Sequence, residues 1–144
     1  MIIVSFRYVC PSQCRVQSAI RPDFVLYRYG NTITDMKEVG RFHIKHINYN
    51  HMISNTPNYA VIVIYPVAMN YGTILEHEMH PLETLERLDE PTYFYLINLH
   101  DGSVLDGFES EDESMVFATH HMNAWEEGEE VVFDIATNPW DAMK

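Results

Sequence analysis

The chain has 144 residues, and 47% of them are hydrophobic, which argues against a disordered chain and allows one domain with a real core. Its formal net charge is -12. That charge weighs against nucleic acid and anionic lipid head groups as partners, because both attract clustered Lys and Arg. Nine Tyr and seven Phe favour β structure, since aromatic side chains suit half-buried pleated surfaces.

The two cysteines, Cys10 and Cys14, form a single close pair rather than a disulfide framework, and they fit a reducing compartment. The apolar start of the chain is too short for a membrane span and shows no cleavage site. We therefore expect an untargeted, cytoplasmic chain. The acidic runs at residues 109–113 and 126–130 are read as solvated turns.

Strand-like runs separated by turn signals begin at residue 24. Residues 24–29 are rich in Val, Leu and Tyr and stop at Gly30-Asn31, and residues 40–49 show no helical period. The strongest buried-strand candidate is 59–65, which ends at Pro66. The Asn-Thr-Pro-Asn turn before it predicts a hairpin of 47–54 with 59–65.

Residues 67–90 differ from the rest of the chain. Leucines and a methionine recur there at about helical spacing, with Glu and Arg between them. The pattern predicts a short amphipathic helix or a loop insertion, broken at Pro81.

Strand character then returns, with two further hairpins. Residues 92–99 run into Asp101-Gly102, a strong hairpin signal, and 103–108 pair back. Residues 114–125 and 131–135 flank an acidic turn at Gly128.

The elements add up to an all-β chain of about seven or eight short strands with a short helical insertion. A sandwich, a barrel and propeller blades all fit this pattern. Residues 1–21 do not connect smoothly to it, and the chain stops shortly after a hairpin. A truncated chain or a partial gene model fits both ends.

The histidines are the main candidates for a functional site, because imidazole is the commonest protein metal ligand. His77 and His80 lack the spacing of a zinc-protease helix, and a zinc site around them is the weakest interpretation. We place His100 at a hairpin surface. The eight histidines are His43, His46, His51, His77, His80, His100, His120 and His121.

Strand alternation sends neighbouring side chains to opposite faces. His43 and His46 are therefore not expected to share a metal, and only one of His120 and His121 can point at a given centre. On this pattern His120 shares a face with Ala118 and Met122. Spacing alone does not choose between His120 and His121. The sequence also has no nucleophile elbow and no Gly-rich phosphate loop.

Two segments resemble signatures of the carotenoid cleavage oxygenases. Residues 49–61, Tyr-Asn-His-Met-Ile-Ser-Asn-Thr-Pro-Asn-Tyr-Ala-Val, resemble the segment in which a His precedes a Thr-Pro/Glu-Asn-Tyr turn. Residues 120–127 resemble the Phe-His-x-x-Asn-Ala-Trp/Tyr-Glu segment, with Thr119 in place of the usual Phe. The resemblance covers residues 23–137, so residues 1–22 are expected to be a non-family segment and 23–144 a family fragment.

The family fold is a seven-bladed β-propeller with iron on its axis, so the resemblance implies a partial propeller of about two to three blades. Four histidines hold the iron in the family. Matching assigns the second ligand to His51 and the third to His120, which stands three residues before Asn123. The first and fourth ligands, and the Glu residues that bond to the ligands, would lie outside this chain.

The resemblance implies a non-haem Fe(II) dioxygenase that adds dioxygen across a conjugated double bond of a carotenoid or apocarotenoid and yields two carbonyl products. Some relatives isomerise retinyl esters instead, so a retinoid is the alternative substrate. The family resemblance is also compatible with peripheral membrane contact by a full-length protein. The competing hypothesis is an inactive β-rich remnant or binding module that lacks a complete iron site.

Overall fold

The computed structural model describes residues 2–8, 22–32, 34–46, 48, 50–112, 117–138 and 140. The predicted cysteine pair, Cys10 and Cys14, lies outside these residues. In chain order the elements are β1 (Ile2–Tyr8), β2 (Pro22–Tyr29), β3 (Met36–His43), β4 (Ser54–Asn55), β5 (Tyr59–Ile64), β6 (Val67–Met69), α1 (Tyr71–His77), η1 (Pro81–Thr84), β7 (Leu85–Arg87), β8 (Tyr93–Asn98), β9 (Val104–Glu109), β10 (Phe117–Glu127) and β11 (Glu130–Asn138). The expectation of an all-β chain with a short helical insertion is confirmed.

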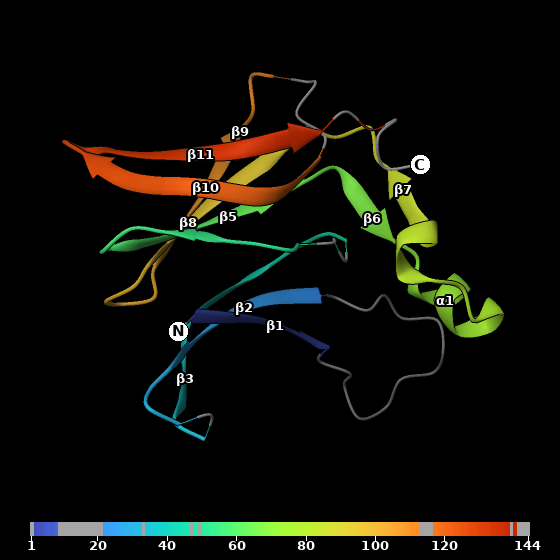
Figure 1. The fold of residues 1–144 in the computed structure, drawn as a ribbon, viewed down its shortest axis with the longest axis horizontal. Coiled ribbons are helices and arrows are strands. Elements are labelled where there is room, and N and C mark those ends of the chain that lie inside the picture. Colours follow the sequence, from blue (N-terminus) through green and yellow to red (C-terminus); the bar gives the residue numbers. More distant parts are fainter. Residues whose placement is uncertain are drawn as a thin grey trace.

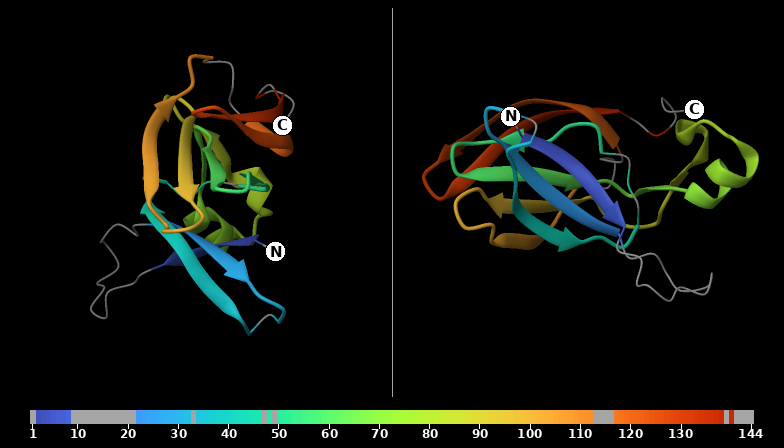
Figure 2. Two further views of the ribbon diagram at one scale, coloured as in Figure 1. Left: turned by 90° about the vertical axis from the view of Figure 1, so that its left-hand side faces the viewer. Right: turned by 90° about the horizontal axis from the view of Figure 1, so that it is seen from below.

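Antiparallel sheets form the body of the molecule (Figures 1 and 2). A central sheet has the strand order β4-β5-β8-β9. The β10–β11 hairpin lies on one side of this sheet, and the β1-β2-β3 sheet lies on the other. The short β6–β7 pair leads to α1 at one end of the molecule.

Strand β5 is buried on both faces, which explains its unbroken apolar sequence. Ala60, Ile62 and Ile64 join a core cluster with Phe24 and Leu26 of β2. On the opposite face Val63 belongs to a second cluster with Tyr65, Val67, Phe117 and Ala118. The predicted buried strand at 59–65 is thus confirmed, and it joins the two cores on which the neighbouring sheets pack.

The predicted strand at 47–54 is wrong over most of its length, since among its described residues only Ser54 lies in a strand, at the start of β4. Asn48 and Asn50 use side-chain amides to bond to backbone carbonyls of 63, 65 and 67. These side-chain bonds hold the segment beside the sheet without a regular ladder of backbone bonds.

The insertion at 67–90 is shorter in its helical part than the leucine spacing suggests. Helix α1 begins after Asn70, whose side chain accepts a hydrogen bond from Thr73 N, and ends at Glu78 in the left-handed conformation with φ 51°. Leu75 is 79% exposed, so the predicted apolar stripe is wrong there. The predicted break at Pro81 is confirmed, because a separate 3-10 turn begins at that residue.

The glycines of two hairpin turns allow a comparison of how much an alanine substitution destabilises each turn. Gly102 and Gly128 both have positive φ, 75° and 64°, where an alanine costs roughly 1–2 kcal/mol. A Cβ at Gly102 would also collide with the backbone oxygen of Val39, whereas a Cβ at Gly128 meets nothing within 4 Å. We expect Gly102→Ala to lower the unfolding free energy clearly more than Gly128→Ala in urea denaturation. Equal losses would contradict the close packing at Gly102.

Candidate metal centre

One of the two predicted ligands, His51, lies on an irregular stretch between β3 and β4. The buried Asn48 amide donates to the carbonyls of Tyr65 at 2.7 Å and Val67 at 2.9 Å. Asn50 donates to the carbonyl of Val63 at 2.9 Å. These bonds anchor the backbone just before His51 along β5 and β6, and the His51 side chain is exposed.

The other predicted ligand, His120, lies on β10, where the pairing with β11 is irregular. Register shifts separate Ala118 from His120 and His121 from Asn123. His120 is exposed and His121 is buried, so the two rings do point to opposite faces. The expectation that His120 shares a face with Ala118 is wrong, because Ala118 is buried and the bulge at Thr119 breaks the alternation.

His51 and His120 come together although they lie far apart in the sequence. Their ring centroids are 5.8 Å apart, with an interplanar angle of 66°. A metal about 2 Å from one nitrogen of each imidazole would hold the ring centroids roughly 4.5–6.5 Å apart. The observed separation falls in this range, so the distance between the two rings is compatible with a shared metal ion.

His121 is buried, whereas His51 and His120 are exposed. Its Nδ1 shares a hydrogen bond of 2.7 Å with the buried Ser54 Oγ. Burial lowers the pKa of His121, which favours the neutral ring. The expectation of a packing or hydrogen-bonding role for His121 is confirmed by this contact.

A second polar contact joins the two motif segments further along. Asn58 donates from its backbone N and its Nδ2 to the two carboxylate oxygens of Glu126, at 3.1 and 2.8 Å. Hydrogen bonds from the side chains of Thr56 and Asn58 lower the pKa of Glu126. His100 Nε2 lies 2.7 Å from Asn58 Oδ1. His100 is exposed in the turn after β8, which confirms the surface position predicted for it.

Three of the remaining histidines have partners of their own. His43 Nδ1 lies 3.4 Å from Asp23 and His46 Nε2 lies 3.2 Å from Glu90, so these two rings do not converge. His80 accepts a hydrogen bond from Leu82 N and caps the 3-10 turn. Within the described part of the chain, no group of three or more His, Cys, Asp or Glu is placed to hold a metal.

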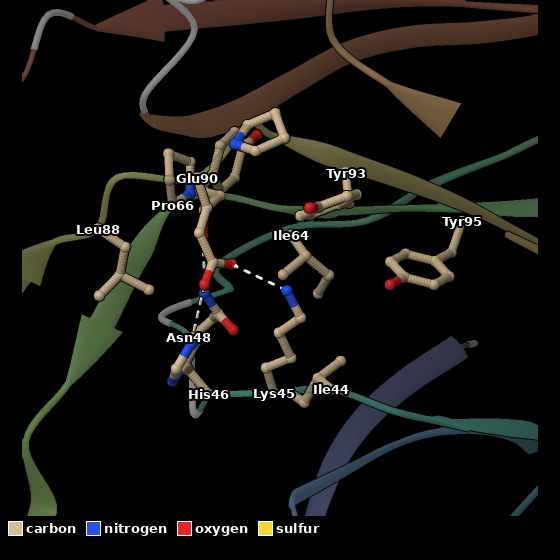
Figure 3. A pocket seen from close by; sticks show the side chains of 12 residues that line it. Ile44, Lys45, His46, Asn48, Ile64, Pro66, Leu88, Glu90, Tyr93 and Tyr95 are labelled. Carbon is tan, nitrogen blue, oxygen red and sulfur yellow. Dashed lines mark hydrogen bonds and ion pairs between the residues drawn. The ribbon is translucent and has the colours of Figure 1, made fainter. Parts of the chain in front are cut away.

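The sequence did not indicate a pocket of about 130 Å³ beside residues 44–46 and 48 (Figure 3). Isoleucine, proline and tyrosine side chains line it, and Glu90 lies there between His46 and Lys45, at 3.2 and 3.8 Å. Asn48 Oδ1 is buried at its wall without a hydrogen-bond partner among the described residues. The pocket is built from three separate segments, so no local pattern in the sequence could indicate it.

Solved structures of apocarotenoid oxygenase have the same fold. Cobalt-substituted Synechocystis ACO matches with a TM-score of 0.67 and 19% identity, over 93% of this chain and 26% of that one. An ACO/RPE65 chimera matches with a TM-score of 0.63 and 20% identity, over 83% and 24%. The chain thus spans about a quarter of the length of these proteins, and it folds as part of their β-propeller.

The sequence match defines the family as well. The family model described as retinal pigment epithelial membrane protein matches residues 12–143. This chain belongs to that family, the carotenoid cleavage oxygenases. No curated protein matches the chain. Among the described residues, none of the helices is long and apolar enough to cross a membrane. The boundary expected at residue 22 stays a prediction.

Proposed function

We propose that this chain is part of a non-haem Fe(II) dioxygenase that cleaves a conjugated double bond of a carotenoid or apocarotenoid to carbonyl products. His51 and His120 would provide two of the iron ligands. The observation that carries the proposal is their proximity, with ring centroids 5.8 Å apart. The two rings come from the two segments whose sequences resemble the family signatures.

The donor set suits this metal, because imidazole ligands accommodate iron. His51 and His120 are both exposed, so an ion and further ligands can approach them from solvent. When bound, Fe(II) would supply the activation of dioxygen for addition across the double bond. The chain's own part is to hold two imidazoles at a fixed separation.

The substrate class rests on relatives rather than on contacts in this chain. The solved structures with the same fold are apocarotenoid oxygenases by name, and membership of the family supports a carotenoid or retinoid substrate. A retinoid isomerohydrolase-like activity is the alternative reaction, and a non-catalytic remnant is the alternative role. We keep a cytoplasmic location, with peripheral membrane contact of a full-length protein, as part of the proposal.

One assay separates these three roles. The purified chain is loaded with Fe(II) without oxygen, its iron content is measured, and it is given β-carotene, an apocarotenal or a retinyl ester in air. We expect bound iron and an aldehyde product from a polyene, both lost in His51→Ala and kept in the surface variant His43→Ala. An isomerised retinol product would favour the isomerase, and absence of both iron and product would favour the remnant.

A further inference from the structure

The two proposed ligands belong to segments that join different sheets, and this raises the question of what aligns them. His51 precedes β4, which pairs with β5, whereas His120 lies on β10, which pairs with β11. Among the described strands, no ladder of backbone hydrogen bonds joins β4 to β10, although the two lie in contact. We call the contact of residues 51–58 with residues 120–126 the seam.

Apolar packing beneath the seam stabilises the contact between the two segments. Phe117 and Ala118 pack against Val63 and Tyr65, and the rings of Tyr65 and Phe117 lie 5.6 Å apart. Such burial is non-directional, so it does not by itself orient the side chains above it. A fixed separation of two imidazoles therefore needs directional contacts near them.

Side-chain hydrogen bonds cross the seam at two places, at His121 and at Glu126. Ser54 Oγ and His121 Nδ1 are 2.7 Å apart, and their residues are 67 apart in the sequence. Asn58 and Glu126 are 68 apart and share two hydrogen bonds. The nearly constant offset shows that the two segments run in the same direction, and His51 and His120 continue this alignment at its start.

We propose that Ser54 and His121, together with Asn58 and Glu126, are positioning residues that set the alignment of His51 with His120. The inference rests on the proposed function for its purpose, but the alignment itself is a property of the metal-free chain. Ser54 is three residues from His51, and His121 adjoins His120. Loss of their bond frees the two ligand-bearing segments to shift against each other.

The test measures the ring pair directly. In the metal-free chain labelled at histidine, NMR cross-relaxation between the His51 and His120 rings reports their separation, and a Co(II) titration reports their affinity. We expect Ser54→Ala and His121→Phe to lose the ring-to-ring signal and to weaken Co(II) binding about tenfold, as supporting contacts of metal ligands do. His121→Asn keeps a side-chain amide at the position of Nδ1 and should restore both readouts.

Ser103→Ala is the matched control, because it removes a hydroxyl that bonds to Asp101 in an exposed turn. It should leave both readouts unchanged. If Ser54→Ala does not fold, Glu126→Ala serves instead, since Glu126 is only partly buried. A ring-to-ring signal unchanged in the folded seam variants overturns the proposal. Failure of the wild-type chain to bind Co(II) would overturn the proposed function alone, because the metal-free signal still decides the positioning role.

Discussion

Alanine at His51 or at His120 is expected to lower the affinity of the chain for Co(II) or Fe(II) by more than about tenfold, beyond the usual effect of losing a supporting contact. Each ring provides one of two donors whose centroids lie 5.8 Å apart, so either loss leaves a single imidazole. Titration followed on the histidine NMR signals measures the effect residue by residue.

His43→Ala is the control for these variants, because His43 is exposed on β3 beside Asp23 and lies outside the pair. It should bind the metal like the wild-type chain. An affinity within twofold of wild type in both His51→Ala and His120→Ala would show that the convergence of the rings does not serve metal binding.

Phe117→Ala is expected to destabilise the chain by roughly 3–5 kcal/mol, as truncation of a buried aromatic side chain does. Phe117 is fully buried at the start of β10 and contacts Tyr65 across the second core cluster. The loss should appear as a lower urea midpoint with an unchanged slope. Because this ring anchors β10 beside β5, the variant should also weaken metal binding at His120.

Phe108→Ala removes the same side chain from β9, where it is 50% exposed. It should cost much less than Phe117→Ala, because less apolar surface leaves a packed environment. Similar losses for the two variants would mean that the second core cluster contributes little to the stability of the chain.

Local signals predicted those parts of the fold that local contacts determine. An unbroken apolar run marked β5, and Asp101-Gly102 marked the β8–β9 hairpin, where Gly102 has the positive φ that the turn requires. The strand prediction for 47–54 failed because Asn48 and Asn50 use their side-chain amides to reach carbonyls 13 to 19 residues away. No period in the sequence encodes such bonds.

The candidate site could be predicted only in part, because it too depends on contacts between residues far apart in the sequence. Strand alternation correctly predicted that His120 and His121 point to opposite faces. The bulges around Thr119 and Met122 could not be predicted, because no Gly or Pro marks them in the sequence. The choice of His120 came from the family resemblance rather than from spacing. The bond between Ser54 and His121 spans 67 residues, so only the folded chain reveals it.

This long span has a consequence for the order in which the molecule assembles. The β8–β9 and β10–β11 hairpins close between near neighbours in the chain, which is entropically cheap and fast. The seam contacts must instead close loops of 67 and 68 residues. A chain can therefore hold most of its strands while His51 and His120 are still apart, and the ring pair reports completed folding rather than strand content.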